Sequence, residues 1–176
     1  MIKYSIINME ILNNGVFTME KSIDDLIEQL GSADEFEREE ALGELQIRSE
    51  EAFDSLVEAL KNRNKNIRRY AAQVLGYIAD ERAIEPLVGA LEDNNKLVRR
   101  EASTSLTRIG EPAFQPLINL LKHENWRVRG AAAWALGSMK KPEAIGPLEE
   151  LLNDESGFVK AGAKSAIDQI KQANGL

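Results

Sequence analysis

The sequence predicts an all-α protein, a right-handed α-solenoid (α-α superhelix) of about five helix pairs. Two observations predict this fold. A motif recurs every 30 or 31 residues, and the apolar residues inside each copy are spaced three and four apart, as on one face of an α-helix. Helices this short are marginally stable alone, so we expect stacked pairs that cover one another's apolar faces.

The repeated motif is clearest in four segments of the chain. These are residues 65–91, 96–121, 126–152 and 157–170. Each copy places a β-branched residue, a base, an alanine and a leucine or isoleucine at matched positions, for example Ile67, Arg68, Ala71 and Leu75. A weaker copy precedes them in the same register. Each full copy then turns and continues with a second amphipathic stretch, so each unit is expected to be a helix pair.

Five repeats are expected, all within one solenoid domain over residues 20–176. The first helix is expected to run from Ile23 to Leu30, because Ser22 with Asp25 three residues later resembles a capping arrangement. The approximate boundaries of the repeats are residues 22–48, 50–79, 81–109, 112–139 and 142–173.

Prolines and glycines mark several helix ends. The second helix of a pair is expected to carry a proline in its first turn, where a missing backbone N–H costs little. The prolines concerned are Pro86, Pro116 and Pro147. The last helix is expected from about Phe158 to Ala173, and Asn174-Gly175 predicts a left-handed stop.

Residues 1–19 do not fit the repeat and are expected to form an N-terminal extension. Asn13-Asn14-Gly15 is a turn signal between short apolar runs, which favours a hairpin. The alternatives are a disordered segment, or a mis-assigned start with translation beginning at Met19. If the segment belongs to the protein, its apolar residues can cover the exposed end of the first helix pair.

The composition of the 176-residue chain excludes several classes of site. There is no cysteine, so disulfides, thiolate metal sites and cysteine nucleophiles are excluded. No apolar run is long enough to span a bilayer, and the N-terminus lacks the features of a signal peptide. We therefore expect no membrane partner and a cytoplasmic location.

The net charge of −7 is unevenly distributed along the chain. Residues 20–64 carry a net charge of −9, whereas residues 65–176 carry a net charge of +2. The charge of the whole chain is therefore a poor guide to what any one face of the solenoid binds.

The best-preserved copy of the motif, residues 67–87, reads IRRYAAQVLGYIADERAIEPL. It resembles the HEAT family and is most similar to the HEAT-like repeats of phycobilisome lyases, whose signature resembles V-R-x-x-A-x-x-A-L-G-x-I-x-D-x-R-A-I-x-P-L. The resemblance covers about residues 22–173 and implies an armadillo-type fold. Scaffolds, lyases and other enzymes share this architecture, so the resemblance alone does not fix a function.

One enzyme branch of similar architecture, the deoxyhypusine hydroxylases, holds two irons with His-Glu pairs early in the inner helix of several repeats. By this resemblance, the equivalent positions here are Arg69-Tyr70, Arg100-Glu101, Gly130-Ala131 and Ala161-Gly162. None of them is a His-Glu pair. His123-Glu124 lies at the end of an outer helix, where we expect a solvated or C-capping histidine. We therefore expect no enzyme, no catalytic or metal-binding residue and no cofactor.

The side of each inner helix opposite its apolar stripe is expected to line the concave surface of the solenoid. Helical offsets of 100° per residue define the residues of this candidate partner-binding groove. They are Arg69, Gln73, Tyr77, Arg100, Thr104, Arg108, Trp134 and Ser138, with Glu101 at the edge. The groove is mildly basic and aromatic, which suits an acidic protein segment.

The two tryptophans are interpreted differently. Trp134 stands where neighbouring repeats have Gln73, Thr104 and Ser165, and a large aromatic at such a position indicates a contact residue. The alternative is that Trp134 packs on its own or a neighbouring helix. For Trp126, at the turn before its inner helix, we favour packing.

One basic position recurs at the margin of the apolar stripe. It is occupied by Arg68, Arg99, Arg129 and Lys160. Recurrence in each of these units favours a structural ladder, in which each base bonds an acidic or carbonyl group of the adjacent turn. Asp93 and Asp154 are the candidate acidic partners.

The sequence thus predicts a non-catalytic scaffold, a monomer, that binds a protein or acidic peptide segment in the concave groove. One alternative is nucleic-acid binding, because HEAT-like DNA glycosylases grip DNA with basic residues and tryptophan. The acidic chain, however, lacks the dense basic stripe expected for that role. A second alternative is a bilin-lyase-like accessory subunit that handles a tetrapyrrole together with a partner.

Overall fold

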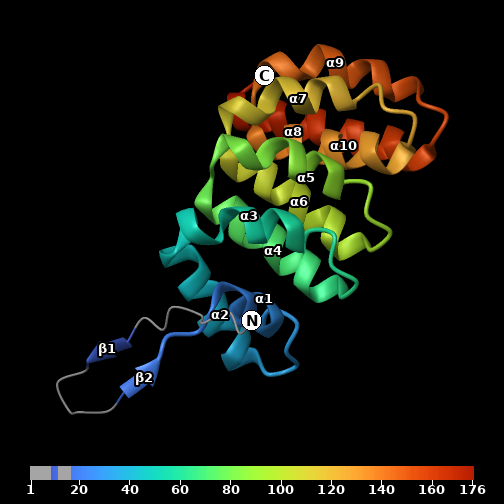
Figure 1. Ribbon diagram of the computed structural model, residues 1–176. Coiled ribbons are helices and arrows are strands. Elements are labelled where there is room, and N and C mark those ends of the chain that lie inside the picture. Colours follow the sequence, from blue (N-terminus) through green and yellow to red (C-terminus); the bar gives the residue numbers. More distant parts are fainter. Residues whose placement is uncertain (1–8, 12–16) are drawn as a thin grey trace.

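A computed structural model describes residues 9–11 and 17–176, and it confirms an all-α solenoid (Figure 1). Within these residues the α-helices alternate along the chain between two layers. The inner layer consists of α2 (Glu35–Ile47), α4 (Lys65–Ile78), α6 (Lys96–Ile109), α8 (Trp126–Met139) and α10 (Gly157–Asn174). The outer layer consists of α1 (Ile23–Gln29), α3 (Ser49–Ala59), α5 (Ile84–Ala90), α7 (Glu111–Leu120) and α9 (Ile145–Glu150).

Shorter elements connect or precede these helices. The connecting 3-10 turns are η1 (Glu81–Ala83), η2 (Pro142–Ala144) and η3 (Leu151–Asn153). Ahead of the solenoid, β1 (Met9–Ile11) pairs antiparallel with β2 (Phe17–Met19). The Asn13-Asn14-Gly15 turn predicted from the sequence lies outside the described residues.

The matched apolar positions of the repeats form the core between the two layers. The buried alanines at one position are Ala71, Ala102, Ala132 and Ala163. The buried leucines and isoleucine four residues later are Leu75, Leu106, Leu136 and Ile167. The outer helices contribute Leu87, Leu117 and Leu148, which are also fully buried. Each such aliphatic side chain stabilises the fold by about 1.5–3 kcal/mol relative to an exposed one.

Two glycines allow inner helices to approach closely. A Cβ built on Gly76 of α4 would lie 2.3 Å from the hydroxyl oxygen of Ser105 on α6. A Cβ built on Gly137 of α8 would lie 2.8 Å from the Cα of Ala166 on α10. On α6 the equivalent position holds Thr107. The contact between α6 and α8 therefore lacks the glycine that lets α4 approach α6 and α8 approach α10.

The outer helices are spaced more widely than the inner ones. Inner helices contact their neighbours from α2 to α10, whereas a groove of about 490 Å³ lies between α3 and α5. The helices α1 and α3 contact each other beside a smaller hollow of about 320 Å³. Closer spacing on the inner side curves the stack toward that side. We call the surface formed by α2, α4, α6, α8 and α10 the inner face.

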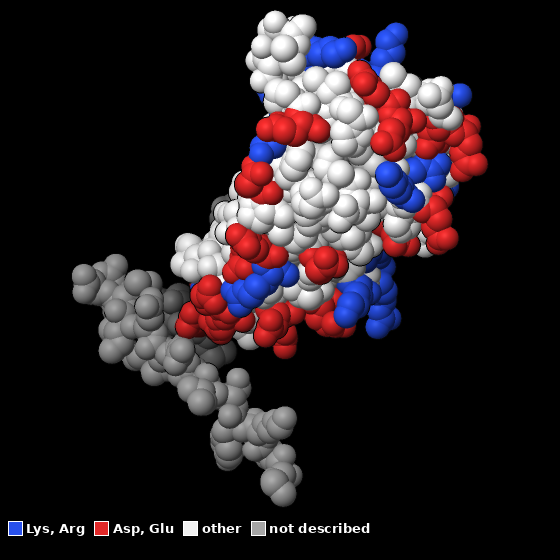
Figure 2. Space-filling view, turned by 90° about the horizontal axis from the view of Figure 1, so that it is seen from above, with Lys and Arg blue, Asp and Glu red and all other residues white. Residues whose placement is uncertain are grey.

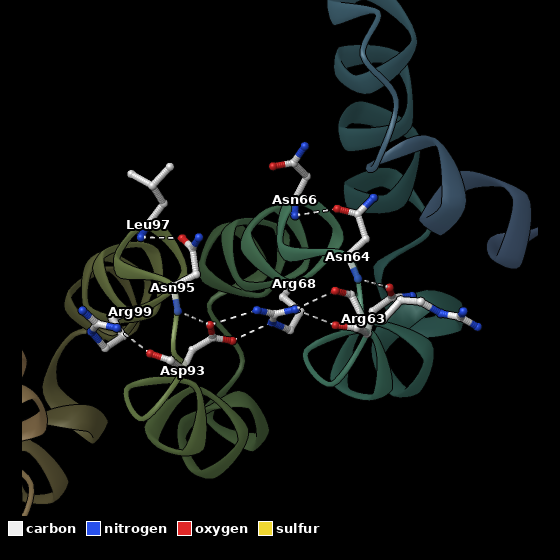
Figure 3. Close-up of polar contacts among 9 residues, drawn as sticks. Arg63, Asn64, Asn66, Arg68, Asp93, Asn95, Leu97 and Arg99 are labelled. Atoms are coloured by element: carbon white, nitrogen blue, oxygen red, sulfur yellow. Dashed lines mark hydrogen bonds and ion pairs between the residues drawn. The ribbon is translucent and has the colours of Figure 1, made fainter.

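The predicted arginine ladder is present and ties neighbouring repeats together (Figure 3). Arg68 donates two hydrogen bonds to the carboxylate of Asp93, from Nε at 2.6 Å and from Nη2 at 3.0 Å. Its Nη1 donates to the carbonyl of Asn62 in the preceding turn. The hydrogen bonds from Arg129 likewise hold the pKa of the Asp154 carboxyl below its ordinary value.

The ladder is incomplete at the α6–α8 seam. Arg99 donates to the carbonyl of Asp93 at 2.6 Å, as Arg68 and Arg129 do to their own preceding turns. The turn residue that corresponds to Asp93 and Asp154 in the next repeat is His123, so Arg99 has no carboxylate there. Lys160 forms no ladder hydrogen bond within the described residues.

His123 has a structural place in its turn. Its Nδ1 accepts a hydrogen bond from the backbone N–H of Asn125, the N-cap of α8, at 3.1 Å. Asp93 and Asp154 accept the equivalent bond from Asn95 and Ser156. The expected C-capping role is therefore replaced by a turn role that its repeat equivalents share.

The predicted ends of the solenoid agree with the structure, but one proline does not. Ser22 and Asp25 form a capping box at the start of α1, and Gly175, with a φ of 69°, follows α10. Pro116 lies inside α7 rather than in its first turn. The reason is that α7 begins directly after Gly110, without the 3-10 turn that precedes α5 and α9.

Candidate functional site

The outer helices differ in charge from the inner helices α4 to α10, whereas the inner helix α2 carries five glutamates and one arginine. The inner helices α4, α6, α8 and α10 carry twelve Lys and Arg residues against two acids, Glu101 and Asp168. The outer helices α1, α3, α5, α7 and α9 carry eleven acids and no Lys or Arg. From above (Figure 2), charged side chains lie around the margin of the molecule, and a broad uncharged area occupies the middle. The inner helices from α4 to α10 are thus basic although the chain is acidic, and three of their bases, Arg68, Arg99 and Arg129, bond to the turns.

Exposed large apolar side chains are also concentrated on the inner helices. Among the described residues, the inner helices carry Phe36, Ile47, Tyr77, Trp126, Trp134 and Phe158. The others are Leu152 in η3 and Leu176 at the C-terminus, and the described outer helices carry none. Aromatic and basic groups on one face are the composition expected of a binding surface.

At α4 and α6, a buried acid organises two of the predicted groove arginines. Glu101 is only 9% exposed, and its Oε1 accepts a hydrogen bond from Arg108 Nη1 at 3.2 Å. Its Oε2 lies 3.9 Å from Nε of Arg69, which has no hydrogen-bond partner within the described residues. The Arg108 guanidinium also covers the ring of Tyr77, 4.4 Å from its centroid. Glu101, which was expected at the edge of the groove, is thus buried beside Arg69 and Arg108.

Other predicted groove residues of α4 and α6 are less constrained. Arg100 is exposed and forms no ion pair within the described part of the chain. Gln73 is half-buried, and the Thr104 hydroxyl donates to the carbonyl of Arg100. Arg100 is therefore the groove arginine best able to contact a partner carboxylate.

On α8, Trp134 projects from a surface of small residues. Its indole is 43% exposed, and Ser138 one turn later donates its hydroxyl to the Trp134 carbonyl. Nothing lies within 4 Å of a Cβ built on Gly130, one turn earlier, or on Gly162 of α10. The exposure of Trp134 favours the contact interpretation over the packing one.

Trp126 packs against the next repeat, as expected, but it also contributes to an exposed aromatic pair. Its ring stacks on Phe158 of α10 with centroids 5.7 Å apart and an interplanar angle of 21°. The guanidinium of Arg127 lies 4.8 Å from the centroid of Trp126. Phe158 remains 79% exposed. Sequence reasoning missed Phe158, although it occupies the same repeat position as Arg127 and could have been found by that register.

The described residues offer no evident metal site. No three His, Cys, Asp or Glu side chains gather there in a group that could hold an ion. The Nε2 of the half-buried His123 lies 3.5 Å from a carboxylate oxygen of the exposed Glu92. None of the helices in residues 23–174 is long and apolar enough to cross a bilayer.

Comparison with solved structures gives three informative neighbours. The chain is similar to the complex of CpcE and CpcF of phycocyanin lyase from Nostoc sp., with 25% identity over 82% of this chain and 96% of that chain and a TM-score of 0.60. Human deoxyhypusine hydroxylase shows 27% identity over 68% of this chain and 43% of its own, with a TM-score of 0.56. The YibA protein of Escherichia coli shows 25% identity over 82% and 57%, with a TM-score of 0.55.

Comparison with curated proteins found no match, whereas comparison with protein-family models identifies the repeats. The family model for HEAT repeats matches residues 23–104 and 84–168, which include α1 to α9 and the first part of α10. The stacked helix pairs and this match show that the chain belongs to the HEAT-repeat family.

Proposed function

We propose that the chain is a non-catalytic scaffold that binds an acidic segment of a partner protein on its inner face. The observation that carries the proposal is the coincidence of basic and exposed aromatic residues on the inner helices, opposite an acidic outer layer. A basic face attracts an acidic segment and orients it during encounter. Exposed Trp and Tyr side chains supply the contacts that hold it.

The non-catalytic part of the proposal rests on the residues at the hydroxylase positions. Arg69-Tyr70, Arg100-Glu101, Gly130-Ala131 and Ala161-Gly162 stand where that resemblance requires His-Glu pairs. Arg69 and Arg108 are engaged with Glu101, which makes this region a charged contact surface. We also propose a monomer, because the exposed glutamates of α2, Glu35, Glu37 and Glu39 among them, disfavour pairing of like surfaces.

A bilin-lyase-like accessory role is the second candidate. It is favoured by the similarity to the structure of the CpcE and CpcF complex, which extends over 82% of this chain and 96% of the matched chain. This role requires that the chain, alone or with a partner, perturbs the absorbance spectrum of an added bilin. An unchanged spectrum in the presence of the chain and its captured partner would exclude it.

The proposed function is tested by titration of a fluorescent, glutamate-rich peptide of about a dozen residues that carries one leucine or tryptophan. We expect saturable binding that a lysine-rich peptide of the same length does not show. Trp134→Ala and Arg100→Glu should each weaken binding about tenfold or more, the range of interface hot spots.

Two variants provide matched controls for these substitutions. Leu152→Ala removes an apolar side chain of similar exposure, 40% against 43% for Trp134, from a 3-10 turn outside the inner face. Lys122→Glu makes the same charge change as Arg100→Glu after outer helix α7. Equal losses in the control and inner-face variants would reject the proposed surface. Tighter binding of a DNA duplex than of the peptide, with strong salt dependence, would favour the nucleic-acid alternative instead.

A further inference from the structure

We infer that two parts of the inner face bind different parts of the partner segment. The acidic part of the segment lies over α4 and α6, and an apolar side chain of the same segment lies over α8 and α10. This inference rests on the proposed function and adds to it the direction of the bound segment. It follows from the different chemistry of three successive parts of the inner face.

The middle part, α4 and α6, is built for carboxylates. It presents Arg69, Arg100 and Arg108, of which two share one buried acid, Glu101. The third, Arg100, is exposed and unpaired within the described residues. Because Glu101 neutralises only one of three guanidinium groups, this part retains a net positive charge. The buried Nε of Arg69 is a further donor without a partner in the described structure.

The C-terminal part, α8 and α10, also carries exposed bases such as Arg127 and Lys164, but it differs from the middle part in its exposed aromatic side chains, which suit an apolar side chain. Exposed Trp134 lies at one end of a surface of small residues, and the stacked rings of Trp126 and Phe158 lie at the other. Trp126 and Trp134 are eight residues apart on α8, which corresponds to ~12 Å along the helix. Gly130 and Gly162 leave the space between these aromatic groups open. An aliphatic or aromatic side chain of a partner fits this shallow apolar surface.

The N-terminal part, α2, bounds the site. It belongs to the inner layer but carries five glutamates and one arginine, and all of these glutamates except Glu44 are exposed. It repels an acidic segment instead of attracting it, and thereby limits the footprint to α4–α10. Phe36 of α2 occupies the same repeat position as Phe158 and is equally exposed, at 78% and 79%. These two phenylalanines differ in the charge that surrounds them.

The spacing of the helices sets the spacing of the partner residues. Packed helices lie ~8–10 Å apart, which is about the length of three residues of extended chain. A segment that places a carboxylate on Arg100 of α6 therefore reaches Trp134 of α8 with an apolar residue about three positions away. Acidic residues on the other side of the carboxylate extend toward Arg69 of α4.

The direction is tested by photo-crosslinking on the full chain. The first probe is a glutamate-rich peptide with a leucine near one end and a benzophenone group next to that leucine. The second probe is the same peptide with the benzophenone at the acidic end. We expect the first to crosslink to residues of α8 and α10, and the second to residues of α4 and α6. Crosslinks in the reverse order, or both sets on α2, would overturn the inferred direction.

A substitution pair separates this inference from the proposed function. Phe158→Ala should weaken the leucine-containing peptide about fivefold or more but leave an all-glutamate peptide unchanged, while Phe36→Ala should affect neither. Equal effects of the two substitutions would reject the apolar end of the site. If no acidic peptide binds at all, the proposed function fails first. If the peptides bind, and if Arg100→Glu abolishes this binding while Phe158→Ala does not change it, only the inferred direction of the segment fails.

Discussion

Arg129 on α8 and Asp154 in the turn before α10 form a paired contact between repeats, with Nε and Nη2 donating to the two carboxylate oxygens at 2.7 and 2.9 Å. Both side chains are largely buried. Asp154→Asn removes the buried charge and leaves Arg129 with only the exposed carboxylate of Glu155, 3.3 Å from its Nη2. We expect a loss of about 3 kcal/mol in the free energy of unfolding, as for other broken buried pairs. Urea unfolding of the variant measures this loss, and a change within error would contradict the ladder's structural role.

The seam between α6 and α8 can be completed. Arg99 makes the same backbone contact as Arg68 and Arg129, but the turn position of the next repeat that holds their aspartates is occupied by His123. His123→Asp keeps an acceptor for the Asn125 N–H and supplies the missing carboxylate. We expect stabilisation by about 1 kcal/mol, seen as a rise in Tm of roughly 3 °C for a chain of this size. His123→Asn retains the acceptor without the charge and should give no such rise. A gain of equal size in both variants would assign the effect to the turn and not to the ion pair.

Close packing of α4 on α6 depends on the absence of a side chain at Gly76. In Gly76→Ala the new Cβ would meet Ser105, whose hydroxyl donates to the carbonyl of Ala72 at 2.7 Å. We expect destabilisation of about 1–3 kcal/mol from overpacking. The control is Gly89→Ala on α5, where no atom lies within 4 Å of the added Cβ and helix propensity favours alanine. Thermal unfolding should therefore show a lower Tm for the first variant only, and equal Tm values would contradict the close approach.

The ladder aspartates make stability depend on pH. Burial raises the pKa of Asp93, but the hydrogen bonds from Arg68 and from the Asn95 N–H outweigh this effect, so the pKa lies below its ordinary value. A folded-state pKa below the unfolded one stabilises the protein at pH values above the unfolded pKa, and this contribution is lost as the pH falls from about 4 toward the folded value.

The Asp93→Asn, Asp154→Asn double variant tests this dependence. The double variant should be less stable than the parent at neutral pH. It should also lose less of its remaining stability between about pH 5 and pH 3, because the two carboxyl groups that take up protons in this range have been replaced by amides. Urea titrations at several pH values measure both quantities. A variant with the full acid dependence of the parent would place the responsible carboxylates elsewhere.

Glu101 limits the positive charge of the inner face. Glu101→Gln retains an oxygen that can accept from Arg108 and removes the negative charge beside Arg69 and Arg108. We expect a glutamate-rich peptide to bind about fivefold more tightly, in line with ~1 kcal/mol for one unit charge near the surface. The gain should shrink in high salt. Weaker binding by this variant at low salt would mean that Glu101 orients the arginines and that its charge is of minor importance.

The solenoid could be predicted because its signals repeat. The positions of Ala71, Leu75 and Arg68 recur in the following units, so periodicity fixes the helices, their buried stripe and the ladder. Ser22 and Gly175 mark the ends through local backbone chemistry, which a short stretch of sequence carries. Pro116 was misplaced because the start of α7 depends on the turn before it, which differs between repeats.

The candidate surface could be predicted only in part. Helical offsets identified residues such as Arg100 and Trp134 as outward-facing, and both are exposed. The burial of Glu101 between Arg69 and Arg108 could not be predicted, because it depends on how far α4 and α6 approach each other. The stack of Trp126 on Phe158 likewise joins two helices across a seam whose spacing the repeat pattern does not give.

The central claim, that an acidic segment binds on the inner face, is tested most directly by the two indole N–H signals of the chain in a ¹⁵N-labelled NMR sample. Trp134→Ala assigns which signal belongs to which tryptophan. Addition of a glutamate-rich, leucine-containing peptide should shift the Trp134 signal progressively to saturation and leave it unshifted in Arg100→Glu. A peptide that binds, as judged by fluorescence anisotropy, while both indole signals stay in place would contradict the assignment of the inner face as the binding surface.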